Sequence, residues 1–491
     1  MASTELIYIN FTGGIVSPGY LKDLLEIAAA NKVSHVSFGL LPQLMMDVPT
    51  KNFSSFASAC EEKNIKFYKR KAVAPNIVSS YLTAGIFTRD SWLREGVYKD
   101  VFNLFDYDPK LKINICDSTQ CFVPFFTGHL NWISSDTPHF WYLYIFLPKS
   151  QNVVCWPDLV YANDVALLSA HLEQYLLNAG KTNINSLYKK VKPTISYVSK
   201  AMDKELELPY FSLPYYEGFN KHENTQWHGI YRRDELFQVQ FLLDLCKICL
   251  QCKIGELYTT PWKSIIIKGI ESSHRNLWDY TLGHYRINVC HAANELNWQI
   301  EDYDEEGLMI KRHIIRHFDK EDVRTYGLVF AIQTNATSNL FGSIIIRKQQ
   351  FKNSNRLKSL DRFDILHTGD FNPNSSNLVV YRQDIEKEYL GPYLVSLCKF
   401  FYERQSAEKS VPSETVYPLV NNDVNTASAK IIYQCKYCFT VYDEAFGDAE
   451  NNIAPGTSFN NLQESYHCPL CESGKNNFVT INGSSLELQD S

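Results

Sequence analysis

Residues 435–471 read CKYCFTVYDEAFGDAENNIAPGTSFNNLQESYHCPLC, and this stretch begins and ends with a Cys-x2-Cys pair. The cysteines are Cys435, Cys438, Cys468 and Cys471. Two such turns that face each other form a tetrahedral cage of four thiolates, which suits zinc or iron. The spacing therefore predicts one metal ion held by these four side chains.

The sequence around these four cysteines resembles rubredoxins, and the resemblance extends over the full length of the segment. The shared residues are Tyr433, Tyr442-Asp443, Gly447-Asp448, Ile453-Ala454-Pro455-Gly456-Thr457, Phe459, Cys468-Pro469-Leu470-Cys471, Lys475 and Phe478. The resemblance implies a rubredoxin-like domain at 431–480, followed by a tail at 481–491. It also implies one iron ion (Fe2+/Fe3+) per chain on the four cysteines, with zinc as the alternative, and electron transport one electron at a time. A closed shell of four sulfurs leaves no position for a substrate.

Three departures separate this sequence from the rubredoxin pattern. Rubredoxins usually carry glycine directly after the second cysteine of each pair, where this chain has Phe439 and Glu472. Tyr466-His467 replaces an aromatic residue, usually Trp, and an apolar one. Because backbone N–H groups in these turns point at sulfur, we expect the changes to affect the reduction potential and the choice of metal more than the fold.

Charge is unevenly distributed along the 491 residues. The whole chain has a net charge of -6, and residues 431–491 contain two lysines and eight acidic residues, which is also -6. The rest of the chain is close to neutral, so we expect no binding to nucleic acid or to a membrane surface. The first ten residues lack a basic, apolar leader, and no apolar run is long enough to span a bilayer. A cytoplasmic protein is expected, with its 13 cysteines as thiols or metal ligands.

Residues 5–68 and 229–289 carry the same pattern of elements. In the first copy the expected elements are strand Leu6–Phe11, a helix opened by Ser17-Pro18, strands Val33–Phe38 and Leu44–Val48, helix Phe53–Lys63 and strand Ile65–Tyr68. In the second they are a helix from Leu236 to Leu245, strands Gly255–Thr259 and Ser264–Ile267, a helix within Ile270–Gly283 and strand Tyr285–Val289. Two copies so far apart predict a pseudo-twofold body rather than a solenoid.

The segments after each copy are also mixed. Strands are expected at Lys112–Ile115, Trp141–Leu147, Tyr326–Ile332 and Gly342–Arg347, and helices within 164–204 and at Asp384–Arg404. Residues 405–430 are polar, with two prolines, and are predicted to form a linker.

The two copies resemble the ferredoxin-like half domains of nitrite and sulfite reductases. The matching stretches are Gly13-Gly14-Ile15-Val16-Ser17, Pro42-Gln43-Leu44, Thr259-Thr260-Pro261-Trp262, Gly269-Ile270 and Pro109-Lys110-Leu111-Lys112-Ile113. The resemblance implies an α+β body: half domains at 1–75 and 226–300, an α/β middle segment at 76–225, and a completing segment at 301–404.

That reductase family holds sirohaem beside a four-iron cluster, on cysteines spaced C-x5-C and C-x3-C. This chain has Cys116-x4-Cys121 and no C-x3-C. The arginine that precedes Gln in the half-domain motif is Pro42 in the first copy, and the two positions are matched by Trp262-Lys263 in the second. Sirohaem and the four-iron cluster are therefore not expected.

Two further groups have the residue types of metal sites. Cys246-x2-Cys249-x2-Cys252 could supply three ligands of a four-iron cluster, but the cysteines follow a helical apolar pattern and a buried helix face is favoured. His313 and His317 are four residues apart without the glutamate of an HExxH motif, which favours ordinary structural roles.

Two functions follow from these patterns. The first is an iron-binding redox protein, with one-electron transfer through a rubredoxin-type centre attached to a sirohaem-reductase-like body, acting with an unknown redox partner protein. The alternative is a non-enzymatic binding or assembly protein with a structural zinc knuckle. The sequence identifies no catalytic or cofactor-binding residue in the body, so whether the chain is itself an oxidoreductase stays open.

Overall fold

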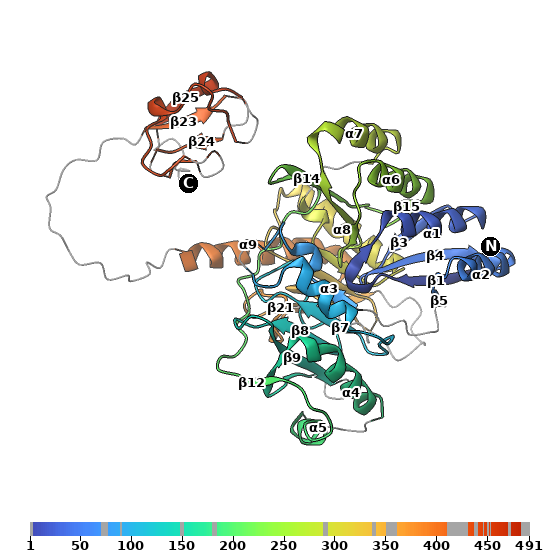
Figure 1. Ribbon diagram of the computed structural model, residues 1–491. Coiled ribbons are helices and arrows are strands. Elements are labelled where there is room, and N and C mark those ends of the chain that lie inside the picture. Colours follow the sequence, from blue (N-terminus) through green and yellow to red (C-terminus); the bar gives the residue numbers. More distant parts are fainter. Residues whose placement is uncertain are drawn as a thin grey trace. The chain divides into compact units, whose positions relative to one another are not determined.

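The computed structural model describes most of the chain. The described residues are 3–69, 77–88, 91–147, 152–178, 184–287, 293–335, 340–349, 361–409, 431–436, 440–444, 446–448, 451, 453–469 and 473–482. The chain divides into two compact units, residues 1–410 and 411–491 (Figure 1). We call the first unit the body and the second the module.

The first half domain is a sheet covered by two helices. Its elements are β1 (Thr4–Asn10), α1 (Pro18–Ala30), β3 (His35–Phe38), β4 (Gln43–Pro49), α2 (Phe53–Glu62) and β5 (Tyr68–Lys69). Helix α1 begins as the sequence predicts, because the Ser17 hydroxyl accepts a hydrogen bond from the Tyr20 N–H and Pro18 takes the first helical position. The predicted strand at Ile65–Tyr68 is reduced to Tyr68–Lys69.

The second half domain repeats this arrangement. Its elements are β13 (Gly218–His222), β14 (Thr225–Ile230), α6 (Val239–Gln251), β16 (Leu257–Thr259), β17 (Ile265–Ile270) and α7 (Arg275–His284). Two predictions were wrong here. The first helix starts at Val239 rather than Leu236, which is 42% exposed. Tyr285 follows α7 in a turn, and the end of the predicted strand Tyr285–Val289 lies outside the described residues.

The half domains exchange one short strand each. Strand β2 (Ile15–Val16) pairs with β16 of the second half domain, and β15 (Phe237–Gln238) pairs with β3 of the first. Both strands directly precede the first long helix of their own copy. The helices consequently lie side by side in the order α2, α1, α6, α7 and share one apolar core (Figure 1).

A second sheet follows the first half domain. Its elements are β6 (Ile77–Ser79), α3 (Glu95–Asn103), β7 (Ile113–Cys116), β8 (Leu130–Ser134), β9 (Phe140–Leu147), β10 (Asn152–Cys155), β11 (Asp158–Tyr161), α4 (Val165–Asn178), α5 (Ile184–Val191) and β12 (Ser199–Ala201). Strands β6, β7 and β8 are parallel, and β9 joins β8 antiparallel. The expected helices within 164–204 are α4 and α5, but the segment also contains β12.

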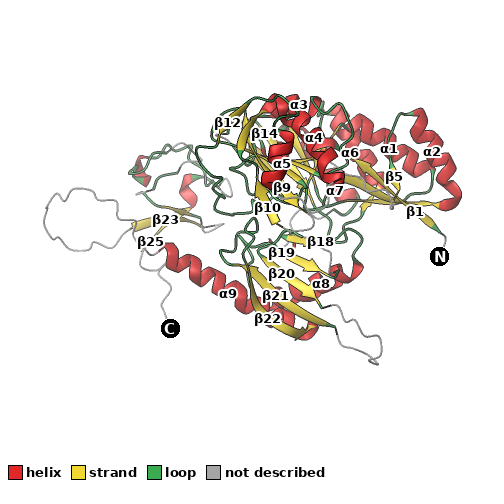
Figure 2. Ribbon diagram, turned by 90° about the horizontal axis from the view of Figure 1, so that it is seen from below, coloured by secondary structure: helices red, strands yellow, loops and turns green. Residues whose placement is uncertain are grey.

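The same sheet is built again after the second half domain. Its elements are β18 (Trp298–Ile300), α8 (Glu305–Lys320), β19 (Phe330–Gln333), β20 (Ile344–Lys348), β21 (Arg362–Thr368), β22 (Leu378–Glu386) and α9 (Leu390–Lys409). Strands β18, β19 and β20 are parallel and β21 is antiparallel, as in the first copy. Helices α8 and α9 pack on it (Figure 2).

Predicted boundaries shift in this last segment. The strand expected from Tyr326 begins at Phe330, because residues 326–327 form a turn and residues 328–329 are not paired in the sheet. The helix expected from Asp384 begins at Leu390, because residues 384–386 still belong to β22, which pairs with β21. The predicted linker at 405–430 starts too early, since residues 405–409 continue α9, and residues 410–430 lie outside the described part. The body is therefore a tandem repeat of half domain and sheet, which confirms the predicted α+β pseudo-twofold architecture.

The module is a small sheet around aromatic side chains. Its strands are β23 (Ile431–Cys435), β24 (Val441–Tyr442) and β25 (Phe478–Asn482), in the order β24-β23-β25. None of the helices in the described ranges has the length and apolar character needed to cross a lipid bilayer.

His228 on β14 is buried where the sheet of the second half domain meets its helix α7. Its ring stacks on Phe219 with 3.9 Å between centroids, and it meets the Trp278 ring of α7 edge-on with 6.4 Å between centroids. Burial lowers the pKa of His228 to about 4. The imidazole is therefore neutral in the folded body at the pH of most cells.

We predict that His228 weakens the body in acid. Between about pH 6.5 and 4 the unfolded chain binds a proton at this histidine and the folded chain does not, so the free energy of unfolding falls as the pH falls, by up to about 3 kcal/mol. Urea unfolding followed by tryptophan fluorescence should show that His228→Leu loses this part of the pH dependence. His284→Leu, at an exposed position, should keep it, and identical profiles for wild type and His228→Leu would contradict the prediction.

Candidate metal centre

Two of the four predicted ligands lie within the described residues, and both are buried. Cys435 ends β23, the central strand of the module's sheet, and is 0% exposed. Cys468 lies in the loop before β25 and is 1% exposed. Cys438 and Cys471, the second member of each pair, lie outside the described residues.

The two cysteine turns have the same backbone geometry. The Cys435 N–H donates to the Thr440 carbonyl at 2.8 Å, and the Cys468 N–H donates to the Ser473 carbonyl at 2.8 Å. In both turns the hydrogen bond joins a cysteine to the residue five positions further on. The second cysteine of each pair lies between the two bonded residues in the sequence, as expected for two equivalent thiolate clamps.

A hydroxyl group connects the clamps. The Ser473 Oγ of the second turn lies 3.1 Å from the Cys435 Sγ of the first. When Cys435 is a thiolate, the serine is the donor, because the sulfur then has no proton to give. The contact brings the two clamps together, and it is a feature that the Cys-x2-Cys pattern did not reveal, since Ser473 follows the motif.

Aromatic side chains form the core beneath the clamps. Tyr433 stacks on Phe459 with centroids 4.1 Å apart, and Tyr442, Tyr466 and Phe478 complete the cluster. These five side chains form the aromatic core of the module. Tyr466, where rubredoxins usually have Trp, donates its hydroxyl proton to the Asp448 carboxylate at 2.8 Å. This position therefore keeps its aromatic bulk and gains a polar contact.

Two glycines fix the loop between the clamps. Gly447 has φ +68°, and a Cβ there would lie 2.5 Å from the Ile453 carbonyl oxygen. Gly456 has φ +86° in the turn formed by Pro455 and Gly456. Phe439 and Glu472, which replace the glycines of the clamps themselves, lie outside the described residues.

Lys475 ties the loop to the core. Its side chain is 12% exposed, and Nζ donates to the Leu462 carbonyl at 2.7 Å and the Asn460 carbonyl at 3.3 Å. Its backbone N–H donates to the Tyr466 carbonyl at 2.9 Å. This lysine therefore holds the segment that carries Cys468.

The other predicted groups in the body have packing roles. Cys246 and Cys249 are buried on α6, as favoured from the sequence, and burial raises the pKa of Cys246 to about 12. His313 and His317 lie on α8 with ring centroids 5.0 Å apart. Among the described residues, no three His, Cys, Asp or Glu side chains are arranged to hold a metal ion.

Both units are similar to known proteins. The rubredoxin family model matches residues 432–478. The chain is 50% identical over 48 residues to the probable rubredoxin HupI of Bradyrhizobium diazoefficiens, covering 10% of this chain and 70% of that protein. It is 49% identical over 49 residues to the probable Rubredoxin-2 of Methanocaldococcus jannaschii, covering 10% and 87%.

Longer relatives are matched in part. The chain is 42% identical over 79 residues to the high molecular weight rubredoxin of Moorella thermoacetica, covering 16% of this chain and 33% of that protein. It therefore spans one third of that relative's length. Among solved structures, the Mycobacterium tuberculosis NirA protein superimposes with a TM-score of 0.61 at 13% identity, covering 84% of this chain and 82% of that one. The body thus has a NirA-like fold, which confirms the predicted resemblance to nitrite and sulfite reductases.

We predict that Lys475→Met weakens the module. Loss of two hydrogen bonds from a buried ammonium group should lower its free energy of unfolding by about 1.5–3 kcal/mol, and metal release to a chelator should accelerate. The matched change Lys436→Met, on an exposed side chain, should have little effect. Equal release rates from the two variants would show that the lysine contacts are unimportant.

Proposed function

Because the chain belongs, through its C-terminal module, to the rubredoxin family, we propose that it is an iron-dependent electron carrier. Cys435, Cys438, Cys468 and Cys471 would hold one iron ion. The observation that carries the proposal is the pair of buried cysteines in matching turns, joined by the Ser473 hydroxyl.

Bound iron would supply reversible one-electron chemistry, and the protein sets the conditions for it. The aromatic cluster lies beside the buried Cys435 and Cys468 and would shield their sulfurs from water, and one backbone hydrogen bond in each turn would help to hold these two ligands in place. Four protein ligands leave no open coordination position, so the module carries electrons and does not itself transform a substrate.

The partner is proposed to be a redox protein with a basic face. All of the chain's net charge of -6 is accounted for by residues 431–491. Charge of one sign concentrated on a small unit attracts an oppositely charged partner and speeds their association. Association should therefore slow as the salt concentration rises. The absence of a basic excess argues against nucleic acid as the partner.

A structural zinc knuckle is the second candidate. Phe439 and Glu472 stand where rubredoxins have glycine, and a side chain at such a position alters the backbone N–H groups that face the sulfurs. In this alternative the metal stabilises the module, and the chain is a binding or assembly protein.

Metal analysis of the intact protein, with a visible spectrum before and after dithionite, distinguishes the two. We expect one iron per chain and absorption bands that bleach and return on reoxidation. Cys435→Ser should remove both the iron and the colour, whereas Cys398→Ser, a buried cysteine on α9, should remove neither. Zinc in a colourless wild-type protein would refute the electron carrier.

The Ser473 hydroxyl should raise the reduction potential. A hydrogen bond to a thiolate favours the more negative, reduced centre, and a neutral hydrogen bond worth about 0.5–1.5 kcal/mol corresponds to about 20–60 mV for one electron. Ser473→Ala should lower the potential by that amount in a spectroelectrochemical titration. Ser465→Ala, at an exposed position, is the control, and an unchanged potential in Ser473→Ala would rule out this role.

A further inference from the structure

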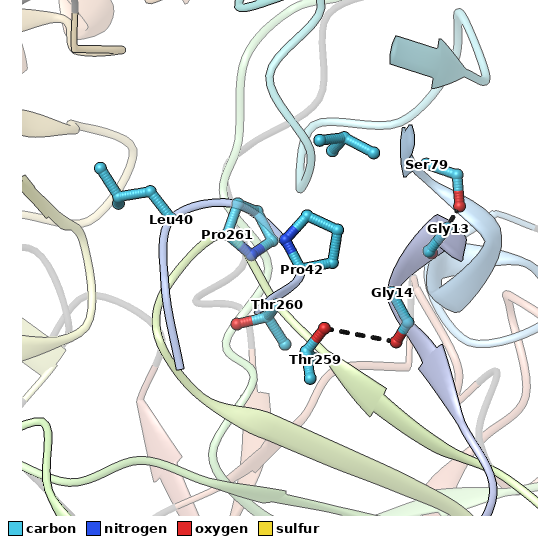
Figure 3. Close-up of a pocket in the computed structure, with 9 residues that line it drawn as sticks. Gly13, Gly14, Leu40, Pro42, Ser79, Thr259, Thr260 and Pro261 are labelled. Atoms are coloured by element: carbon cyan, nitrogen blue, oxygen red, sulfur yellow. Dashed lines mark hydrogen bonds between the residues drawn. The ribbon is translucent and has the colours of Figure 1, made fainter. Parts of the chain in front are cut away.

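The resemblance of the body to nitrite and sulfite reductases implies sirohaem and a four-iron cluster, and the place for such groups would be the junction of the two repeats. The hairpin between β3 and β4 meets the hairpin between β16 and β17 where the two repeats join (Figure 3). Gly13, Gly14, Val78 and Ser79 close the third side. These hairpins carry the half-domain motif in which that family has an arginine before Gln, a cationic side chain that could bind an anion.

The space at this junction is too small for a tetrapyrrole. It measures about 10 Å3, which is room for no more than one water molecule. Pockets for cofactors and comparable ligands typically exceed about 300 Å3. Pro42 and Pro261 approach each other across the gap, one from each hairpin (Figure 3).

The polar groups around this space are bonded within the protein. The Ser79 hydroxyl donates to the Gly13 carbonyl at 2.7 Å, and the Thr259 hydroxyl lies 3.4 Å from the Gly14 carbonyl. The Thr260 and Ser264 hydroxyls are 2.6 Å apart. No charged side chain is among the nine residues that line the space. The lining therefore offers nothing that would neutralise the carboxylates of a sirohaem.

The strand register also corrects the sequence match between the hairpins. Phe38 pairs with Leu44 as Thr259 pairs with Ile265, and each hairpin is closed by a 3.0 Å backbone hydrogen bond, Gly39 N–H to the Gln43 carbonyl and Thr260 N–H to the Ser264 carbonyl. Counting from these pairs, Lys263 is the counterpart of Pro42. The sequence match had assigned Trp262 to that place.

The Lys263 ammonium group is nevertheless already paired with groups inside the protein. It is 3% exposed, and its Nζ lies 2.6 Å from a Glu235 carboxylate oxygen and 3.5 Å from one of Asp302. It also donates to the Glu301 carbonyl at 3.1 Å. Two internal carboxylates thus take the place that an external anion would need, and Lys263, the only Lys or Arg in the two hairpin turns (residues 39–43 and 260–264), is neutralised.

The neighbouring residue, Trp262, also fills space near the junction of the repeats. Trp262 is 2% exposed, and its indole N–H donates to the Phe122 carbonyl at 3.0 Å. Tyr216 stacks on it with centroids 6.2 Å apart and donates its hydroxyl proton to the Leu296 carbonyl at 2.6 Å. Large aromatic side chains therefore fill the region around the junction.

The cysteines do not fit a cluster either. Cys116 is buried with its Sγ 3.7 Å from the Pro124 carbonyl, whereas the Cys121 Sγ contacts the Tyr210 carbonyl at 3.3 Å. Cys246 and Cys249 belong to a different apolar core, that of the half domains. Over the described residues these thiols provide no set of cluster ligands.

We infer that the body is a cofactor-free form of the reductase fold, closed at the junction of its repeats by Lys263, its two carboxylates and the aromatic side chains around them. On the function proposed for the module, its metal is then the redox group, and the described residues of the body offer no metal site that could accept its electrons. Electrons that reach the module are therefore expected to leave to another protein. This inference concerns the body and goes beyond the function proposed for the module.

The test uses the full-length chain, produced in cells that make sirohaem and are supplied with 5-aminolevulinate. Extracts in acidified acetone should contain no tetrapyrrole, and the protein should contain no acid-labile sulfide. Addition of sirohaem to the purified protein should give no saturable spectral change. Bound tetrapyrrole or labile sulfide in stoichiometric amount would overturn the inference.

Cysteine variants separate the body from the module. Iron content should be unchanged in Cys121→Ser and in the double variant Cys246→Ala/Cys249→Ala, and circular dichroism checks that each remains folded. Cys435→Ser should contain no iron, and iron that persists in it would place a second centre in the body. If the wild type contains zinc alone, the proposed electron transfer fails while the inference about the body still depends on the tetrapyrrole and sulfide results.

Discussion

The reciprocal exchange of β2 and β15 is the constraint on which the body depends. Each half domain's sheet is completed by a two-residue strand from the other copy, so neither sheet is complete alone. Helices α1 and α6 start directly after the exchanged strands, which fixes them side by side over one shared core. The same pairing brings Gly13-Gly14 and the two hairpins to the junction of the repeats. A close approach of backbones there follows from the topology.

The repeated backbone carries different side chains at this junction. Equivalent hairpin positions hold Pro42 in one copy and Lys263 in the other, although the strand registers are the same. A buried lysine is costly unless it is paired, and Glu235 and Asp302 supply the pairing from outside the hairpin. The symmetry of the fold is therefore not matched by symmetry of charge. A site that needed two equivalent cations could not form on this pair of hairpins.

Local signals in the sequence predicted much of this structure. Ser17-Pro18 located the start of α1, and the Cys-x2-Cys pairs located the turns that bury Cys435 and Cys468. Signals that depend on distant partners were missed. Strands β2 and β15 have two residues each and pair with segments more than 200 residues away in sequence, so no local pattern marks them. The start of α9 was misplaced for the same reason, since residues 384–386 are held in β22 by pairing with β21.

The body and the module differ in the size of their apolar cores, and this difference is relevant to function. The body has large apolar cores and needs no metal to hold them together. The module has only a handful of core side chains, so the proposed metal would contribute to its folding as well as to its chemistry. Net charge also differs between the two units. The acidic excess lies in residues 431–491, whereas the body is nearly neutral. We therefore propose that long-range attraction selects the module's partner, while the body contributes a neutral surface to the encounter.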